Sequence, residues 1–206
     1  MEKYQNKYRI DTTRLKNWDY GANGFYFVTI CARHHENYFG DIIQPVETLN
    51  FASLPSPQLH PTPIGKIAQQ YWFEIPDHFP FVVLDEFVIM PDHLHGILYF
   101  DKPDRRDAKS CVSTTVISAT NKFGPQSKNL ASVIRGYKAA VKKYATINSI
   151  EFAWQPRYHD HVIRTERELQ AIRRYIQNNP KKWMDKMNNL NVGIQNFTSL
   201  HCQSKK

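Results

Sequence analysis

Two spacings of apolar residues along the chain predict strands and helices in alternation. Residues 25–32 (FYFVTICA) are rich in β-branched and aromatic side chains, which is typical of a strand. Residues 81–90 and 93–100 predict a second and a third strand, joined by a tight turn into a hairpin. Residues 158–164 predict a fourth strand, which leads directly into the last helix.

Helical spacing occurs in three segments. Residues 62–78 and 130–145 repeat apolar side chains at steps of three and four residues. The last helix begins at a capping box made by Thr165 and Glu168. Its apolar face consists of Leu169, Ile172 and Ile176. Pro180 is expected to end it, because proline interrupts helical hydrogen bonding.

The order of these elements predicts the fold class. Strand, helix, strand, strand, helix and strand match the βαββαβ order of ferredoxin-like α+β folds, and one more helix follows. In such a fold the antiparallel sheet carries helices on one face, and the other face is free for a nucleic acid or for the extra helix. We expect one domain over residues 1–183, with a flexible insertion at 102–128 and a polar C-terminal tail at 184–206.

Charge and composition narrow the function classes. The chain carries a formal charge of +8, which makes an acidic polymer such as nucleic acid a plausible partner. Its three cysteines are widely spaced and match neither a disulfide framework nor a zinc site. A signal peptide and a run of about eighteen apolar residues are both lacking, so we expect no membrane span and a cytoplasmic, nucleoid-associated protein.

His93 and His95 lie two residues apart in the third predicted strand. Residues at this spacing point to the same face of a strand, so both imidazoles face one side. Two neutral imidazoles on one face can hold a divalent metal ion. The alternative is a pair of ordinary surface or core histidines.

Tyr175 and Asn179 lie four residues apart near the end of the last helix, and therefore on one helical face. Tyr175 falls directly beside the apolar stripe, where its hydroxyl can reach a cleft. Asn179 can add an amide oxygen to the two imidazoles, and such a ligand set suits Mg²⁺ or Mn²⁺ better than structural zinc. The alternatives are a boundary aromatic residue and a helix C-terminal asparagine.

Basic side chains mark two candidate DNA contacts. Arg135, Lys138 and Lys142 lie largely off the buried stripe of the 130–145 helix, where they can meet a DNA backbone or only solvent. Arg14 and Lys16, in the N-terminal arm, are further candidates.

Four stretches together resemble one family, the single-tyrosine HUH transposases, and most of all their REP-associated branch. They are FYFVTIC at 25–31, VIMPDHLHG at 88–96, WQPRYHDHVIR at 154–164 and YIQNNP at 175–180. The resemblance covers roughly residues 14–183 and depends on the combination of the four stretches. Two features depart from the family pattern: an aspartate, Asp92, precedes the histidine pair where asparagine is common, and the 102–128 insertion is long.

The resemblance implies a function and assigns roles. His93 and His95 would bind the metal, Asn179 would complete the site, and Tyr175 would be the nucleophile. The substrate would be single-stranded DNA with a hairpin, cut and rejoined through a 5′-phosphotyrosine, and the N-terminal arm would recognise sequence near the hairpin. The family includes enzymes that work as dimers and others that act alone, so the chain is expected to be a monomer or a homodimer.

Several readings stay open from the sequence. In His159-Asp160-His161, either the two histidines or the carboxylate can face the site, but not both. For Asp92 we favour a turn cap over a role in tuning the histidines. A replication or mobilisation initiator with the same chemistry is one alternative function. A ferredoxin-like module that binds single-stranded nucleic acid without catalysis is another.

Overall fold

The computed structural model describes residues 3–4, 7–8, 14–15, 17–44, 56–103 and 127–188. The strands are β1 (Lys3–Tyr4), β2 (Lys7–Tyr8), β3 (Gly24–Cys31), β4 (Gly40–Ile43), β5 (Gln58–Pro61), β6 (Val82–Ile89), β7 (His93–Phe100) and β8 (His159–Ile163). The helices are η1 (Arg33–His35), α1 (Pro63–Phe73), α2 (Ile75–His78), α3 (Leu130–Ile147) and α4 (Glu166–Gln177). A further helical stretch covers residues 179–188. Lys16, most of the expected insertion and residues 189–206 of the expected tail lie outside the described residues.

The main sheet has four strands in the order β6-β7-β3-β8, and every neighbouring pair is antiparallel. The first and third strands of the βαββαβ unit, β3 and β7, therefore occupy its centre. Helix α1 connects β3 to β6, and α3 connects β7 to β8. This is the strand order of a ferredoxin-like fold, and the predicted α+β class is confirmed.

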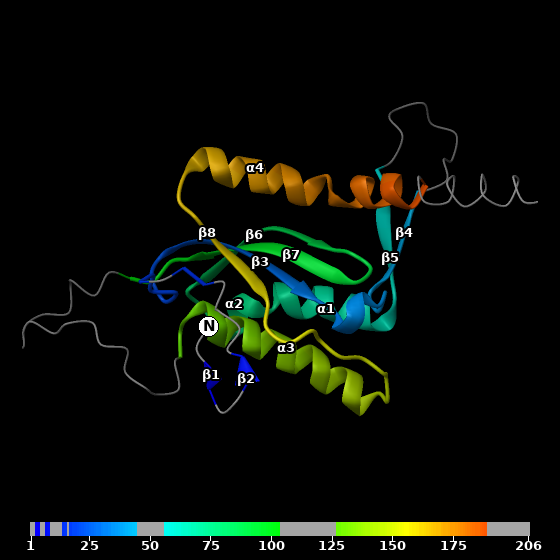
Figure 1. Cartoon of the computed structure of the whole chain (residues 1–206), viewed down its shortest axis with the longest axis horizontal. Helices are drawn as coiled ribbons and strands as arrows, with labels where there is room; N and C mark the ends of the chain where they lie inside the picture. Colours follow the sequence, from blue (N-terminus) through cyan, green and yellow to red (C-terminus); the bar gives the residue numbers. More distant parts are fainter. Residues whose placement is uncertain are drawn as a thin grey trace, which may run out of the picture.

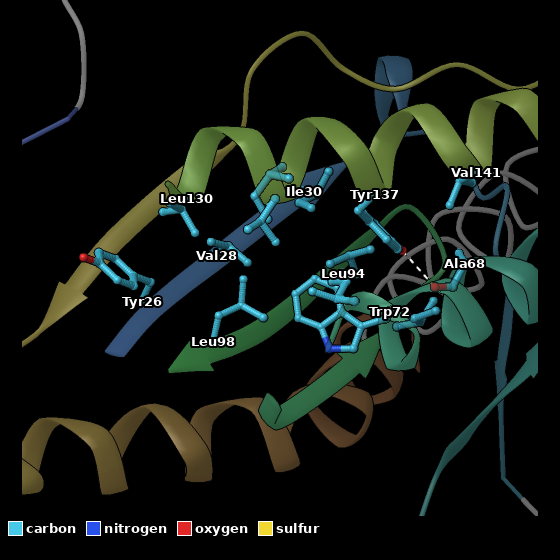
Figure 2. Close-up of a cluster of buried hydrophobic side chains, with 14 of the residues drawn as sticks. Tyr26, Val28, Ile30, Ala68, Trp72, Leu94, Leu98, Leu130, Tyr137 and Val141 are labelled. Atoms are coloured by element: carbon cyan, nitrogen blue, oxygen red, sulfur yellow. Dashed lines mark hydrogen bonds between the residues drawn. The ribbon is translucent and has the colours of Figure 1, made fainter. Parts of the chain in front are cut away.

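Helices α1 and α3 cover one face of the sheet, below it in Figure 1. Alternate residues of β3 point into this layer, and so do Leu94 and Leu98 of β7 (Figure 2). The layer contains most of the buried apolar side chains. One polar bond joins its two helices, because the Tyr137 hydroxyl donates to the Ala68 carbonyl oxygen at 2.9 Å.

Helix α4 crosses the opposite face of the sheet, above it in Figure 1. Its Leu169 and Ile176 pack on Ile97 of β7 and Ile163 of β8, as the apolar stripe in the sequence predicts. Thr165 caps the helix by accepting a hydrogen bond from the Glu168 amide at 3.2 Å. The Glu168 carboxylate, however, accepts from the Arg164 amide, so only half of the predicted capping box forms.

Two prolines change the helices in ways that the sequence analysis did not predict. The single helix expected at 62–78 is divided at Glu74, because Pro76 lacks the amide hydrogen needed to continue α1 and instead enters the first turn of α2. Helix α4 ends at Gln177, before Pro180 as expected. Helical structure then resumes at residue 179, with Pro180 in its first turn, where a missing amide hydrogen costs nothing.

An arm leaves the sheet between β3 and α1. Its strands β4 and β5 pair antiparallel, from Gly40 opposite Pro61 to Ile43 opposite Gln58. This hairpin lies at one end of the main sheet (Figure 1). Residues 45–55 lie outside the described part of the chain.

Candidate active site

Strand β7 presents His93 and His95 on the face that α4 covers. Leu94, between them, is fully buried on the opposite face, as strand alternation requires. The Nε2 atoms of the two histidines lie 3.1 Å apart, and the centroids of their rings lie 4.7 Å apart. His95 is 4% exposed, so the pair sits at the bottom of the site rather than on the open surface.

Helix α4 brings Tyr175 to the same place. The Tyr175 hydroxyl lies 3.2 Å from His95 Nε2, although 80 residues separate the two in the chain. Phe27 of β3 stacks on the His95 ring at 5.5 Å and meets the Tyr175 ring edge-on at 6.2 Å. The tyrosine remains 41% exposed, so its ring is anchored on one side and open to solvent on the other.

Neighbouring side chains hold both imidazoles through their Nδ1 atoms. Thr29 Oγ1 lies 2.8 Å from His95 Nδ1, across the β3–β7 pair. The Asp92 carboxylate binds His93 Nδ1 with one oxygen and His35 Nδ1 with the other, the second at 2.8 Å. The turn-cap role that the sequence analysis favoured for Asp92 is therefore wrong, because this carboxylate is bonded to the two histidines.

Burial and hydrogen bonding shift the pKa values of His95 and Asp92. Burial lowers the pKa of His95 to about 3, and the neighbouring His93 acts in the same direction, so the His95 ring is neutral near neutral pH. Burial alone would raise the pKa of Asp92, but hydrogen bonds and charge from His93 and His35 hold it below its usual range. An ionised Asp92 only accepts hydrogen bonds, so His93 carries its proton on Nδ1 and offers a lone pair on Nε2.

The pair fits a divalent cation with nitrogen ligands. Two ligands at about 2.1 Å from a metal ion and at right angles to each other lie about 3.0 Å apart. The separation of 3.1 Å between the two Nε2 atoms matches this value. Within the described residues no group of three or more His, Cys, Asp or Glu side chains forms a metal cluster.

Asn179, the third metal ligand that the family resemblance implies, stays a prediction. It is 9% exposed and lies at the start of the helical stretch 179–188, one turn beyond Tyr175. The same stretch adds two side chains that the sequence analysis missed. The Trp183 ring lies 6.0 Å from the His93 ring, and Lys182 Nζ lies 5.4 Å from the centroid of the Tyr175 ring. The sequence analysis missed both residues because it took Pro180 as the end of the helical structure.

The predicted DNA-binding residues do not join this site. Arg135, Lys138 and Lys142 belong to α3, on the other face of the sheet, where Arg135 is exposed. Lys138 Nζ donates to the carbonyl oxygens of Gln155 and Arg157 at 2.7 and 2.9 Å, and burial lowers its pKa. Lys142 Nζ donates to the Phe152 carbonyl oxygen at 2.7 Å.

Arg14 lies against β8. Its guanidinium donates to the Tyr158 hydroxyl at 2.7 Å and pairs with Asp160 at 3.7 Å. Asp160 is buried on this side of β8, and the exposed His159 and His161 face the side of α4. The open choice in His159-Asp160-His161 is thereby resolved: the two histidines, not the carboxylate, share a face with His95. His161 is bonded to Glu168 of α4 at 2.6 Å.

Comparisons with known proteins identify a relative of this chain and solved structures that are similar to it. The chain is 39% identical over 174 residues to an uncharacterised protein of Haemophilus influenzae, covering 82% of this chain and 87% of that protein. The chain belongs to the same family as that protein. No protein-family model matches it. A structure of a REP-associated tyrosine transposase bound to a REP hairpin aligns with a TM-score of 0.47 and 19% identity, over 88% of this chain and 74% of that one.

None of the helices in the described segments has both the length and the apolar composition that a membrane span needs.

Proposed function

We propose that this protein is a transposase that cuts and rejoins single-stranded DNA through Tyr175, with the help of a divalent cation. The observation that carries the proposal is the convergence of three groups from two distant segments. The Tyr175 hydroxyl lies 3.2 Å from His95 Nε2, which lies 3.1 Å from His93 Nε2. A nucleophile beside a metal-ligand pair is what phosphoryl transfer requires.

The proposed reaction exchanges one phosphoester bond for another. The Tyr175 oxygen attacks a backbone phosphorus, and the bond from that phosphorus to the 3′ oxygen of the preceding nucleotide breaks. The phenol gives up its proton and the departing 3′ oxygen takes one up. The products are a 5′-phosphotyrosine and a free 3′ hydroxyl. A second 3′ hydroxyl can then attack the phosphotyrosine and release the phenol, because the ester bond has been conserved.

Each side chain of the site has its own role in the proposed reaction. His93, His95 and Asn179 would hold Mg²⁺ or Mn²⁺, which would offset the negative charge that develops on the phosphate oxygens. Asp92 and Thr29 orient the two imidazoles through Nδ1. Phe27 stacks on the His95 ring from the side of β3. Lys182 places a positive charge beside the Tyr175 ring.

The proposed substrate is single-stranded DNA that contains a hairpin. Arg135 is the best placed of the α3 candidates for a backbone contact, because Lys138 and Lys142 are already bonded to carbonyl oxygens. For the N-terminal arm, DNA contacts by Arg14 and Lys16 remain predictions of the sequence. One chain provides both histidines and the tyrosine, so we propose that a monomer suffices for catalysis.

A labelled hairpin oligonucleotide with a single-stranded flank tests the proposal. After incubation with Mn²⁺ or Mg²⁺ and denaturation, the wild-type protein should form a covalent adduct that migrates with the protein. Tyr175→Phe should abolish the adduct, because the hydroxyl is lost. His93→Ala should abolish it too, while much of the DNA affinity remains, because phosphate contacts elsewhere supply that affinity.

Two outcomes would contradict the proposal. DNA binding without an adduct, across many hairpin sequences and with either ion, would favour a binding module without catalysis. An adduct that persists in Tyr175→Phe would move the nucleophile to another residue. Gln170→Ala serves as the matched control, because Gln170 lies on the same helix, five residues before Tyr175 and on another flank, and its side chain donates to Glu166.

A further inference from the structure

Strand β6 contains a β-bulge where it passes under α4. The register between β6 and β7 shifts between Leu84 and Phe87, so Asp85 and Glu86 interrupt the regular pairing. In a regular strand two consecutive side chains point to opposite faces, but a bulge can turn both to one side. Here both carboxylates are bonded to α4, and the bulge makes that possible.

The two carboxylates bind two side chains that lie one turn apart on α4. Arg173 donates to Asp85 from Nε at 2.9 Å and also from Nη2, which forms a two-pronged ion pair. Gln177 Nε2 donates to a Glu86 carboxylate oxygen at 2.7 Å. The hydrogen bonds of Arg173 hold the pKa of Asp85 below its usual range. The pair is therefore charged at neutral pH.

These bonds flank the candidate nucleophile. Tyr175 lies midway in sequence between Arg173 and Gln177, and in a helix a residue two positions away falls on the other flank. One flank of α4 is thus fastened to the bulge, while the other carries the hydroxyl that reaches His95. Rotation of the helix about its axis would move both flanks together.

Apolar packing alone gives α4 little resistance to such a rotation. Only Leu169 and Ile176 of this helix are buried, and burial of apolar surface is not directional. A two-pronged arginine–carboxylate pair, in contrast, has a defined geometry. The bonds to the bulge therefore restrict the rotation of α4 more narrowly than its apolar contacts do, and the bond of Glu168 to His161 adds a second polar attachment near the start of the helix.

We propose that Asp85 and Glu86, with Arg173 and Gln177, form a clip that positions Tyr175 for attack. This inference rests on the proposed function for its catalytic consequence, but the clip itself can be tested without DNA. None of the four residues touches the reacting atoms; they act through the orientation of α4. A displacement of about 1 Å at a reacting group can cost about a hundredfold in rate.

The main test uses Asp85→Asn, which keeps the size of the side chain and removes its charge. We expect the rate of adduct formation at saturating DNA to fall about tenfold or more, with the Kd for DNA within about twofold of wild type. Amide hydrogen exchange of α4 should become faster, while the amides of β3 and β7 keep their protection. Arg173→Lys should give a similar result, because lysine keeps the charge but lacks the fork.

Charge exchange separates positioning from a general loss of stability. Asp85→Arg combined with Arg173→Asp should recover a large part of the rate that either single change loses. Gln170→Ala, one turn before Arg173 on the same helix and bonded to Glu166 rather than to the bulge, should leave the rate and the exchange unchanged.

The outcomes distinguish failure of the clip from failure of the proposed function. Unchanged α4 exchange in Asp85→Asn would overturn the clip, whatever the activity. A rate that falls only in proportion to the unfolded fraction would also overturn it. If the wild-type protein forms no adduct with any hairpin, the proposed function fails, and the exchange measurement still decides whether the clip holds α4.

Discussion

Asp92 shows how a single residue can organise a site without being a ligand. Its two carboxylate oxygens bind His93 and His35, so the His93 ring is fixed with Nε2 toward His95. His35 reaches this position with a left-handed backbone, at a φ of 56°. A residue in such a conformation is held by its surroundings, and here the bond to Asp92 is part of them.

Asp92→Asn should weaken metal binding. The amide can still bond one histidine, but it loses the charge that fixes the proton on His93 Nδ1. Loss of such a partner of a ligating histidine typically costs about 10- to 100-fold in affinity. Titration with Mn²⁺, followed by calorimetry or by the spectrum of the free ion, measures this, with Asp77→Asn, at an exposed carboxylate of α2, as the control. Equal affinity in Asp92→Asn and wild type would show that the carboxylate does not support the metal site.

Gly96 illustrates a requirement of packing beside the site. A β-carbon at this position would lie 2.2 Å from a ring carbon of Trp72, which is fully buried. We expect Gly96→Ala to lower the free energy of unfolding by about 1–3 kcal/mol or more, because a packed core cannot absorb the added atom. Denaturant unfolding measures the change.

Gly136→Ala in α3 provides the matched control for that substitution. Its β-carbon would lie 3.4 Å from the Phe79 ring, and alanine favours a helix over glycine by up to about 1 kcal/mol. This variant should be as stable as the wild type or more so. If the two variants unfolded alike, the close approach of Trp72 to β7 would not be the cause.

At the scale of elements, the attachment of α4 to β6 should depend on pH. The pKa of Asp85 is lowered in the folded protein, mainly by its hydrogen bonds with Arg173. A carboxyl group with a lowered pKa contributes stability that is fully present above its unfolded pKa of about 3.9 and is lost as the pH falls through the folded value. The exchange of α4 amides should therefore differ between wild type and Asp85→Asn at pH 6, and the difference should disappear once the pH falls below the lowered pKa of Asp85. A difference that persists in acid would indicate that the charge of Asp85 is not what holds α4.

The elements also show what could be predicted from the sequence. The four strands of the main sheet could be predicted from apolar patterning, and the start of α4 could be predicted from the capping residue Thr165. Two features could not be predicted from the sequence: the break between α1 and α2 at Glu74, and the return of helical structure at residue 179. In both places a proline allows either an end or a first turn, and only the packing of later residues such as Trp183 on His93 decides between them.

At the scale of the whole molecule, the two faces of the main sheet have different roles. The layer of α1 and α3 contains most of the core, whereas α4 covers a small apolar cluster and carries Tyr175 to the other face. The sequence predicted that His93, His95 and Tyr175 would meet, and the structure places them together; their chemical roles stay predictions. The sequence did not reveal that Lys138 and Lys142 bond the chain's own carbonyl oxygens. The spacing of lysines on a helix does not show which groups lie opposite their side chains.

The completeness of the site in one chain makes a prediction about subunits. A mixture of His95→Ala and Tyr175→Phe chains should form no more DNA adduct than either variant alone, because the histidines and the tyrosine of one chain serve each other. The adduct assay measures this, with a mixture of wild type and Tyr175→Phe as the positive control. Recovery of adduct in the first mixture would mean that α4 acts on a neighbouring chain.

The bond to Thr29 allows His95 to take either neutral tautomer, whereas the bond to Asp92 allows His93 only one. A hydroxyl can donate or accept, so the Thr29–His95 bond of 2.8 Å survives whichever ring nitrogen of His95 carries the hydrogen. Without a cation, a hydrogen on His95 Nε2 can fill the narrow space in front of the His93 lone pair. A cation in that space needs the opposite tautomer, which Thr29 accommodates by turning its hydroxyl. Arrival of the ion would then require only a proton relocated within one ring and a rotated hydroxyl, with the backbone of β7 and β3 left in place.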